Sequence, residues 1–188
     1  MIILALHGKG SSPQKIKWLI EPLSQFGKVV APQVDMEVNQ ALDFVGKYSF
    51  DLVAGHSRGG TVALLAAAKR SVPVIAISSP CDRVMQRKHL CSYPDGTIQK
   101  MLCKEQENYS ENYLELTSPI NFASKINDAL LIHGNHDEIV PISQSRIMCS
   151  RIKENGGRCA LVELEMKHTP PKSLEKELFR AVEEWIKK

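Results

Sequence analysis

The sequence predicts an α/β protein, with a mostly parallel six-stranded sheet and helices on both of its faces. Short apolar runs alternate with helical patterns along nearly the whole chain, which is typical of successive β-α-β units. The apolar runs are nearly continuous, as expected for strands that are buried on both faces. With 188 residues, 43% of them hydrophobic, the chain is large enough to form one core. We therefore expect a single domain over residues 1–188.

The first half of the chain contains four predicted strands and three predicted helices. The strands are the apolar runs 2–6, 28–31, 51–55 and 74–77. The first helix follows Ser12, an N-cap candidate, because Pro13 suits the first helical position, and we expect Pro22 to kink or shorten this helix. Apolar residues share one helical face over 38–45, and good helix formers fill 58–70.

The alternation stops at residues 81–117, a polar stretch that contains the turn signal Pro94-Asp95-Gly96. A stretch of fewer than about 40 residues is too short for a core of its own. We therefore expect an irregular insertion that caps one end of the sheet as a lid. Two strands and two helices complete the chain, with the strands at 129–132 and 159–164 and the helices at about 141–155 and 174–186.

Charge and hydropathy exclude several classes of partner. The net charge is only +3, and no basic stripe indicates nucleic-acid binding. The local basic excess from Arg83 to His89 is typical of a solvated face. The N-terminal apolar run lacks the basic start of a signal peptide, and no run approaches the roughly 18 apolar residues that span a bilayer. We therefore expect no nucleic-acid partner and no membrane insertion, and the oligomeric state is not predicted.

The five cysteines are odd in number and form no C-x-x-C pair. This pattern favours free thiols in a reducing compartment over a disulfide framework. We therefore expect a cytoplasmic protein with five free thiols. They are Cys81, Cys91, Cys103, Cys149 and Cys159.

A candidate nucleophile lies in Gly55-His56-Ser57-Arg58-Gly59, a G-x-S-x-G motif between a predicted strand and a predicted helix. A serine on such a sharp turn projects its hydroxyl outward, and the glycines permit the unusual backbone that the turn needs. A serine hydroxyl is a weak nucleophile near neutral pH, so it requires a base such as imidazole. The base in turn requires a carboxylate that fixes its orientation.

Polar residues follow the predicted strands at their carboxyl ends, where ligands bind to parallel α/β sheets. Asp137 follows the fifth strand and His168 follows the sixth. We therefore expect Ser57, Asp137 and His168 to meet at one edge of the sheet as nucleophile, acid and base. Asp82, after the fourth strand, is the alternative acid, whereas Asp128 precedes its strand and lies at the wrong end of the sheet.

The remaining histidines and serines of these loops have plainer interpretations. His56 is expected to pack beneath the serine turn rather than to act as the base. His7 either shapes the loop after the first strand or is a packed loop histidine, and His136 is either a bystander or a substrate contact. Structural or surface roles are expected for His89, His133, Ser78 and Ser79.

These motifs resemble those of the α/β-hydrolase superfamily. The resemblance is carried by H-G-x-G at 7–10, the serine turn at 55–60, the acid loop at 131–141 and the late histidine at 168. The stretch 118–168 is similar to the catalytic domain of the prolyl oligopeptidase family and to dienelactone-hydrolase-like esterases. The chain looks like a minimal six-strand member, because it lacks the first two strands of that fold. In addition, Thr169-Pro170-Pro171 follows the late histidine in place of the glycine-aromatic pair of larger relatives.

The resemblance implies a serine hydrolase that needs no metal or organic cofactor. It also implies that the backbone N–H groups of Lys9 and Arg58 form an oxyanion hole. We expect hydrolysis of a small carboxylic ester or thioester through an acyl-enzyme, because no predicted domain would orient a peptide. A short-peptide or acyl-peptide hydrolase is the second hypothesis, and a catalytically silent binding module on the same fold is the third.

Basic side chains near the predicted site have two interpretations. They either make the mouth of the site attractive to a carboxylate-bearing or otherwise polar ester, or they are solvated surface charges. These side chains belong to Lys9, Arg58, Arg83, Arg87 and Lys88. Because several of them lie in 81–117, we expect this insertion to determine the substrate.

Overall fold

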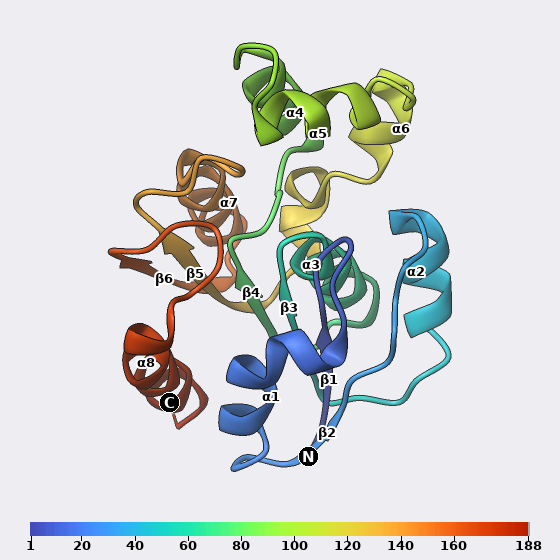
Figure 1. The fold of residues 1–188 in the computed structure, drawn as a ribbon. Coiled ribbons are helices and arrows are strands. Elements are labelled where there is room, and N and C mark those ends of the chain that lie inside the picture. The colour runs from blue at the N-terminus through green and yellow to red at the C-terminus, as the bar shows by residue number, and fades with distance from the viewer. Residues whose placement is uncertain (188) are drawn as a thin grey trace.

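A computed structural model describes residues 1–187, and its centre is a sheet of six parallel strands in the order β2-β1-β3-β4-β5-β6 (Figure 1). The strands are β1 (Ile2–Leu6), β2 (Lys28–Val30), β3 (Leu52–His56), β4 (Val74–Ile77), β5 (Asp128–Gly134) and β6 (Arg158–Leu164). Each strand overlaps a predicted one, with ends that differ by at most two residues. The predicted six-stranded parallel sheet is therefore confirmed.

The strand order reverses beside β1. The chain passes from β1 to β2 on one side, and then crosses to β3 on the other side of β1. In open α/β sheets, ligands bind outside the carboxyl ends of the strands at this switch point. Here the loop that begins at His7 and the turn at Ser57 follow the two strands of the switch point.

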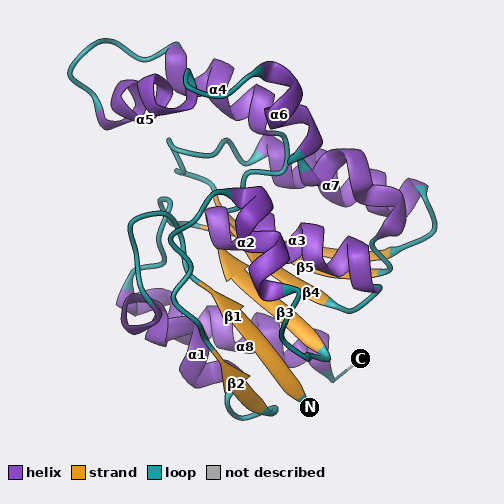
Figure 2. Ribbon diagram, turned by 90° about the vertical axis from the view of Figure 1, so that its right-hand side faces the viewer, coloured by secondary structure: helices purple, strands orange, loops and turns teal. Residues whose placement is uncertain are grey.

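Helices cover both faces of the sheet (Figure 2). One face is covered by α1 (Lys17–Leu23) and α8 (Glu175–Ile186), and the other by α2 (Val38–Val45), α3 (Arg58–Arg70) and α7 (Ser143–Glu154). The short 3₁₀ segments are η1 (Pro13–Ile16), η2 (Pro119–Lys125) and η3 (Lys172–Leu174). The two-layered helical cover agrees with the doubly wound arrangement that the sequence predicts.

The side chains of β1 show how one strand serves two cores. Ile3 and Ala5 belong to the core beneath α1 and α8, whereas Leu4 and Leu6 belong to the core beneath α2 and α3. Successive residues of a strand point to opposite faces. A strand that is covered on both faces therefore needs apolar residues at every position. In α1, Pro22 lies in the last turn of a helix of only seven residues, which confirms the expected shortening.

Residues 81–117 form three helices, so the expectation of an irregular insertion was wrong. They are α4 (Arg83–Cys91), α5 (Ile98–Gln106) and α6 (Glu111–Leu116). These helices lie beyond the carboxyl ends of the strands (Figure 1). Their N-caps are Asp82, Thr97 and Ser110, each of which accepts a backbone N–H of its helix. Such caps stabilise short helices, whereas the apolar stripes of these helices are too short to predict them by periodicity.

The cysteines are not all free, which corrects the sequence-based expectation. Cys91 forms a disulfide with Cys103, and Cys149 forms one with Cys159. Cys81 is buried and is the free cysteine within residues 1–187. Pairing depends on which residues the fold brings together, and the spacings in the sequence do not reveal it. A cytoplasmic location therefore stays a prediction, and the cysteines no longer support it, because four of them are paired.

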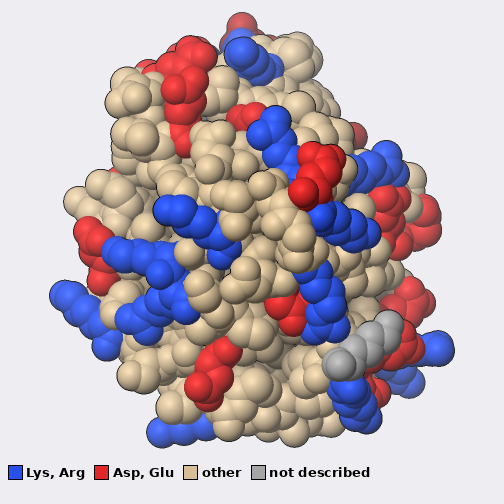
Figure 3. Space-filling model, turned by 180° about the vertical axis from the view of Figure 1, so that it is seen from behind, with Lys and Arg blue, Asp and Glu red and all other residues tan. Residues whose placement is uncertain are grey.

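None of the helices within residues 1–187 is long and apolar enough to cross a membrane. On the face opposite to that of Figure 1, basic and acidic side chains are interspersed (Figure 3).

Candidate active site

Ser57 occupies a strained turn between β3 and α3. Its φ of 54° and ψ of −126° are rare for a residue that has a side chain. The flanking glycines are required by close contacts. A Cβ on Gly55 would lie 2.3 Å from the carbonyl oxygen of Gly59, and a Cβ on Gly59 would lie 2.4 Å from that of Leu6. The turn therefore packs against the end of β1 and holds Ser57 at the switch point.

The side chains of Ser57, His168 and Asp137 form a continuous chain of hydrogen bonds. The Nε2 atom of His168 lies 2.9 Å from Oγ of Ser57, and its Nδ1 lies 2.8 Å from Oδ2 of Asp137. The carboxylate can only accept, so Nδ1 carries a proton and Nε2 of the neutral ring accepts the Ser57 hydroxyl. In this arrangement the imidazole is placed to remove the proton of the serine.

The Asp137 carboxylate is buried among four partners. Its Oδ1 accepts the backbone N–H groups of Ile139 and Val140 at 2.9 and 3.0 Å, and its Oδ2 accepts from His168. Nε2 of His133 lies 3.3 Å from the same Oδ2. Burial alone would raise the pKa of Asp137, but the hydrogen bonds of His133 and His168 outweigh it and hold the pKa well below its usual range. Asp137 is therefore an anion when His168 is available to accept a proton.

His133 is fixed in one tautomer, a detail that the sequence does not reveal. Its Nε2 donates to the carbonyl oxygen of Val140 at 2.9 Å, and its Nδ1 accepts the hydroxyl of Ser145 at 2.6 Å. A carbonyl oxygen can only accept, so the proton lies on Nε2, on the side of Asp137. The structural role that the sequence suggests for His133 thus includes support of the candidate acid. Its partner Ser145 lies in α7, and nothing in the sequence around Ser145 indicates this contact.

His56 packs beneath the serine turn, as the sequence predicts. Its ring lies edge-on to Trp18, with centroids 5.4 Å apart, and its Nε2 donates to the carbonyl oxygen of His168 at 2.9 Å. Burial, followed by the proximity of His168, lowers the pKa of His56 to about 4. His56 is therefore neutral near pH 7 and helps to position the loop of His168.

The loop after β1 lies directly against the candidate nucleophile. A Cβ on Gly8 would be 3.2 Å from Cβ of Ser57. His7 holds this loop, because its Nδ1 donates to the carbonyl oxygen of Gly8 at 2.8 Å and its Nε2 accepts the N–H of Val34 at 2.9 Å. Of the two interpretations of His7, the geometry favours the one in which it shapes the loop.

Lys9 and Arg58 are the two residues whose backbone N–H groups the sequence assigns to an oxyanion hole. Lys9 lines both cavities that adjoin the serine. Arg58 is the first residue of α3, and the first N–H groups of a helix have no intrahelical acceptor. The N–H of Arg58 is therefore without an acceptor in its own helix.

Asp82, the alternative acid, binds a different group, and so does Asp128. Oδ1 of Asp82 accepts the N–H of Met85 at 2.8 Å as the N-cap of α4. Asp128 pairs with Arg158 at the start of β5, at the end of the strand away from the switch point. Neither residue forms a hydrogen bond with His168 within residues 1–187.

Two cavities meet at Ser57 and share it with Lys9. One has a volume of about 360 Å³ and is also lined by Trp18 and His168. The other has a volume of about 100 Å³ and is lined by Arg83 and further residues of α4 and α5. Both cavities therefore open at the candidate nucleophile.

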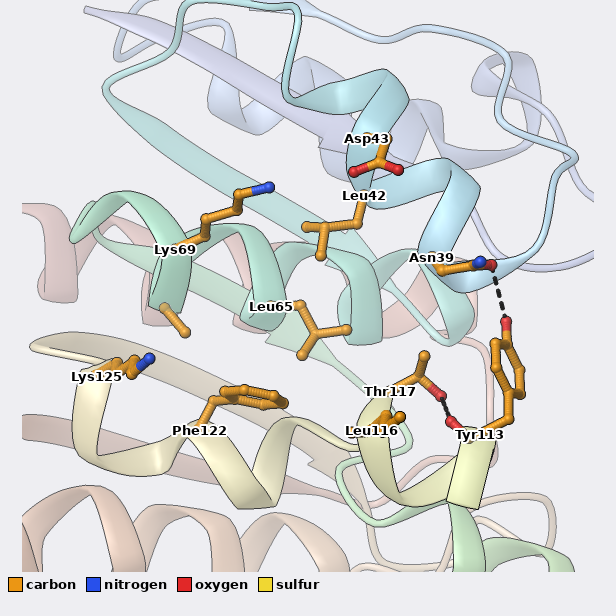
Figure 4. Close-up of a pocket in the computed structure, with 11 residues that line it drawn as sticks. Asn39, Leu42, Asp43, Leu65, Lys69, Tyr113, Leu116, Thr117, Phe122 and Lys125 are labelled. Atoms are coloured by element: carbon orange, nitrogen blue, oxygen red, sulfur yellow. Dashed lines mark hydrogen bonds between the residues drawn. The ribbon is translucent and has the colours of Figure 1, made fainter. Parts of the chain in front are cut away.

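A further cavity of about 420 Å³ lies apart from these residues, between α2, α3, α6 and η2 (Figure 4). Its lining includes Leu42, Leu65 and Phe122, and it contains none of the predicted site residues. A possible cluster of metal ligands, Cys91, Cys103 and Glu107, lies in the α4–α5 segment. Its two sulfur atoms are joined in a disulfide, so it offers no thiolate.

Comparison with known proteins identifies both family and fold. The sequence pattern of the prolyl oligopeptidase family matches residues 1–188. No curated protein sequence matches the chain. The structure is similar to the esterase Pf2001 of Pyrococcus furiosus, with a TM-score of 0.73, 19% identity and coverage of 99% of this chain and 81% of that one.

Two further solved structures share the fold. A monoacylglycerol lipase of Paleococcus ferrophilus has a TM-score of 0.69 and 18% identity, over 98% of this chain and 93% of that one. An acylaminoacyl peptidase has a TM-score of 0.70 and 16% identity, over all of this chain and 36% of that one. The predicted α/β-hydrolase fold is therefore confirmed.

Proposed function

Because the chain belongs to the prolyl oligopeptidase family and is a serine hydrolase, we propose that it cleaves small carboxylic esters or thioesters through an acyl-enzyme on Ser57. The observation that carries this proposal is the hydrogen-bonded chain from Ser57 through His168 to Asp137, at the switch point of the sheet. These three residues come from three separate loops. The packing of the fold does not require their side chains to form hydrogen bonds with one another, so their arrangement supports a catalytic role.

In the proposed mechanism, Oγ of Ser57 attacks the carbonyl carbon while Nε2 of His168 takes its proton. The anionic Asp137 holds Nδ1 of His168 and stabilises the imidazolium that forms. His168 then gives the proton to the leaving oxygen or sulfur, and a water molecule, activated by the same imidazole, hydrolyses the acyl-enzyme. No step requires a metal or an organic cofactor.

The proposed oxyanion hole consists of the backbone N–H groups of Lys9 and Arg58. The strained φ of Ser57 and the contact of Gly8 with it support this role, because they bring the end of β1 and the start of α3 to one point. Loss of one such donor typically reduces transition-state stabilisation by about 2.7–4 kcal/mol. The α4–α6 segment is proposed to act as a lid, because residues of α4 and α5 line the cavity of about 100 Å³ at Ser57.

A short peptide or acyl-peptide is the second candidate substrate. The family match favours it, and the acylaminoacyl peptidase shares the fold, although this chain spans only 36% of that protein. We place small esters first because the cavities at Ser57 are small, about 360 and 100 Å³. The third hypothesis, a silent binding module, is set aside because the family is one of enzymes.

The two substrate classes are distinguished by a panel of p-nitrophenyl esters of increasing acyl length, assayed beside aminoacyl-p-nitroanilides. We expect turnover of the short esters to exceed turnover of every anilide. Faster cleavage of the anilides would transfer the proposal to the peptidase alternative. The Ser57→Ala variant serves as the control for spontaneous and non-specific hydrolysis in both series.

A further inference from the structure

The two cavities at Ser57 divide the proposed active site into a leaving-group side and an acyl side. In acyl transfer, the imidazole that deprotonates the serine later protonates the leaving group, so the leaving group lies next to His168. The cavity of about 360 Å³ contains His168 and Trp18, whereas the cavity of about 100 Å³ contains neither. The acyl group of the substrate therefore extends into the smaller cavity, which we call the acyl cavity.

Arg83 is the unusual side chain of the acyl cavity. Only 7% of it is exposed, although the sequence suggested a solvated charge. Its Nη1 donates to Oγ1 of Thr117, and its Cζ lies 5.6 and 5.2 Å from the ring centroids of Tyr109 and Tyr113. Yet none of the ion pairs within residues 1–187 includes Arg83. Buried guanidinium groups usually have an anionic partner. The Arg83 side chain is an exception, because its neighbours hold it in place without neutralising its charge.

Arg58 is a second cation in the lining of the acyl cavity. Burial lowers the pKa of Arg58, and the nearby Glu37 partly offsets this effect. Glu37 also accepts the hydroxyl of Tyr109 at 2.7 Å. Asp35 is also near Arg58, so the carboxylates on this side of the cavity act on Arg58, whereas no ion pair within residues 1–187 joins either of them to Arg83.

The carboxylates that neighbour Arg83 and Lys9 are engaged by other groups. Asp82, which precedes Arg83 in the sequence, caps α4 by accepting the N–H of Met85. Glu105 of α5 pairs with the ammonium group of Lys9. Of the charged groups that line the acyl cavity, the Arg83 guanidinium is thus the one that is both buried and without an ion pair within residues 1–187, and an anionic ligand gains the most from pairing with a charge that is shielded from water.

A carboxylate on a short acyl chain fits this cavity. A guanidinium group binds a carboxylate through two parallel hydrogen bonds, and the planar fork gives this pairing both strength and orientation. At about 100 Å³, the acyl cavity is the smaller of the two cavities at Ser57, whose other cavity has about 360 Å³. It therefore favours a short acyl chain over a long one.

We propose that the acyl cavity selects monoesters or monothioesters of short dicarboxylic acids, such as succinic acid, with Arg83 binding the free carboxylate. This inference rests on the proposed role of Ser57. With monoethyl succinate, the Ser57 oxygen bonds to the ester carbon, the ester C–O bond breaks, and ethanol leaves with the proton returned by His168. Water then cleaves the succinyl–Ser57 ester, which gives succinate and restores the serine.

The test compares monoethyl succinate with ethyl pentanoate, a neutral ester of similar length, by the release of ethanol. We expect wild-type kcat/KM to be at least about tenfold higher for monoethyl succinate. In Arg83→Gln the ratio of the two values should fall by about tenfold or more, because the charge-assisted hydrogen bonds between the guanidinium group and the carboxylate are lost. Arg83→Lys, which keeps the charge without the fork, should give an intermediate ratio.

Arg87→Gln is the matched control, because Arg87 belongs to the same helix but bonds to the carbonyl oxygen of Tyr109 and does not line the acyl cavity. Its ratio should equal that of the wild type. A second measurement follows labelling of Ser57 by a fluorophosphonate. Succinate should slow this labelling in wild type, the neutral succinamide should not, and the protection should be lost in Arg83→Gln. Thermal unfolding verifies that each variant is folded.

The outcomes separate this inference from the proposed function. Labelling of Ser57 that succinate does not slow, together with equal kcat/KM for the two esters, overturns the anion site and leaves the hydrolase mechanism intact. Absence of any labelling at Ser57 overturns the proposed function, and this inference with it. If Arg83→Gln fails to fold, the wild-type protection by succinate and the ratio of Arg83→Lys decide.

Discussion

Nε2 of His133 lies 3.3 Å from Oδ2 of Asp137, the same oxygen that accepts the hydrogen bond of His168. The carboxylate is therefore held by two imidazoles and by two backbone N–H groups. These contacts lower the pKa of the Asp137 carboxyl, so it remains ionised, and the two N–H groups on Oδ1 orient Oδ2 toward His168. The relationship explains why the acid loop presents Asp137 in one orientation, and it leads to the first prediction.

Asp137→Asn should lower kcat by on the order of 10⁴-fold, because an amide no longer fixes the productive tautomer of the base. Asp82→Asn provides the matched control, since Asp82 caps α4 and does not bond to His168. We expect near-normal turnover in that variant, because asparagine is itself a good N-cap. The measurement is steady-state hydrolysis of the best ester of the panel. Near-normal activity of Asp137→Asn, with loss in Asp82→Asn, would assign the acid to Asp82.

The buried His56 predicts that the protein is less stable in mild acid. Its pKa falls from 6.5 to about 4 in the folded state, so between these values the unfolded chain binds a proton that the folded one does not. The free energy of unfolding therefore decreases as the pH falls from 6.5 to 4, by on the order of 3 kcal/mol. Urea unfolding at pH 7 and pH 4.5 should show this decrease in wild type and a smaller one in His56→Gln. Equal decreases in the two proteins would contradict the assignment.

Gly59→Ala should destabilise the protein and displace the serine turn. Its Cβ would lie 2.4 and 2.5 Å from the carbonyl oxygens of Leu6 and His7, which are backbone atoms at the end of β1 and so cannot turn aside as a flexible side chain could. We expect a loss at or above the upper end of the roughly 1–3 kcal/mol that overpacking causes. Gly46→Ala is the comparison, because its nearest backbone oxygen is 3.2 Å away and its φ is −57°. Denaturant unfolding of both variants measures the difference, and equal losses would count against this packing.

The two disulfides predict the number of reactive thiols. In denaturant without a reductant, thiol titration should find one thiol, that of Cys81, because the other four are paired. Five should appear after reduction. The Cys91–Cys103 bridge links α4 to α5, and closing a loop of this size contributes about 3 kcal/mol in the chain-entropy treatment, so reduction should lower Tm. Five thiols before reduction would restore the expectation from the sequence.

The sheet and the serine turn were predictable because local signals and long-range packing agree there. Helix α3 was predicted from 58 to 70 and occurs at Arg58–Arg70, since the glycine-bounded turn sets its start and Ser71, in the left-handed conformation, ends it. The order of Ser57, Asp137 and His168 along the chain, combined with a parallel sheet, suffices to place them at one edge.

Other features depend on contacts that the sequence does not encode locally. The helices of 81–117 are fixed by their N-caps and by the packing of α4 against α5 and α6 rather than by periodicity. The support of Asp137 by His133, and of His133 by Ser145, requires α7 to lie against β5. The burial of Arg83 likewise follows from the way α6 places Tyr113 and Thr117 around it.

The central claim is that Ser57 is the nucleophile, and the distance of 2.9 Å between its Oγ and Nε2 of His168 is the basis of that claim. The most direct measurement is labelling with a fluorophosphonate, followed by mass spectrometry of the modified peptide. Wild type should be labelled once, on Ser57, and Ser57→Ala should remain unlabelled while keeping its fold. Labelling that persists in Ser57→Ala, or that falls on another serine, would contradict the account.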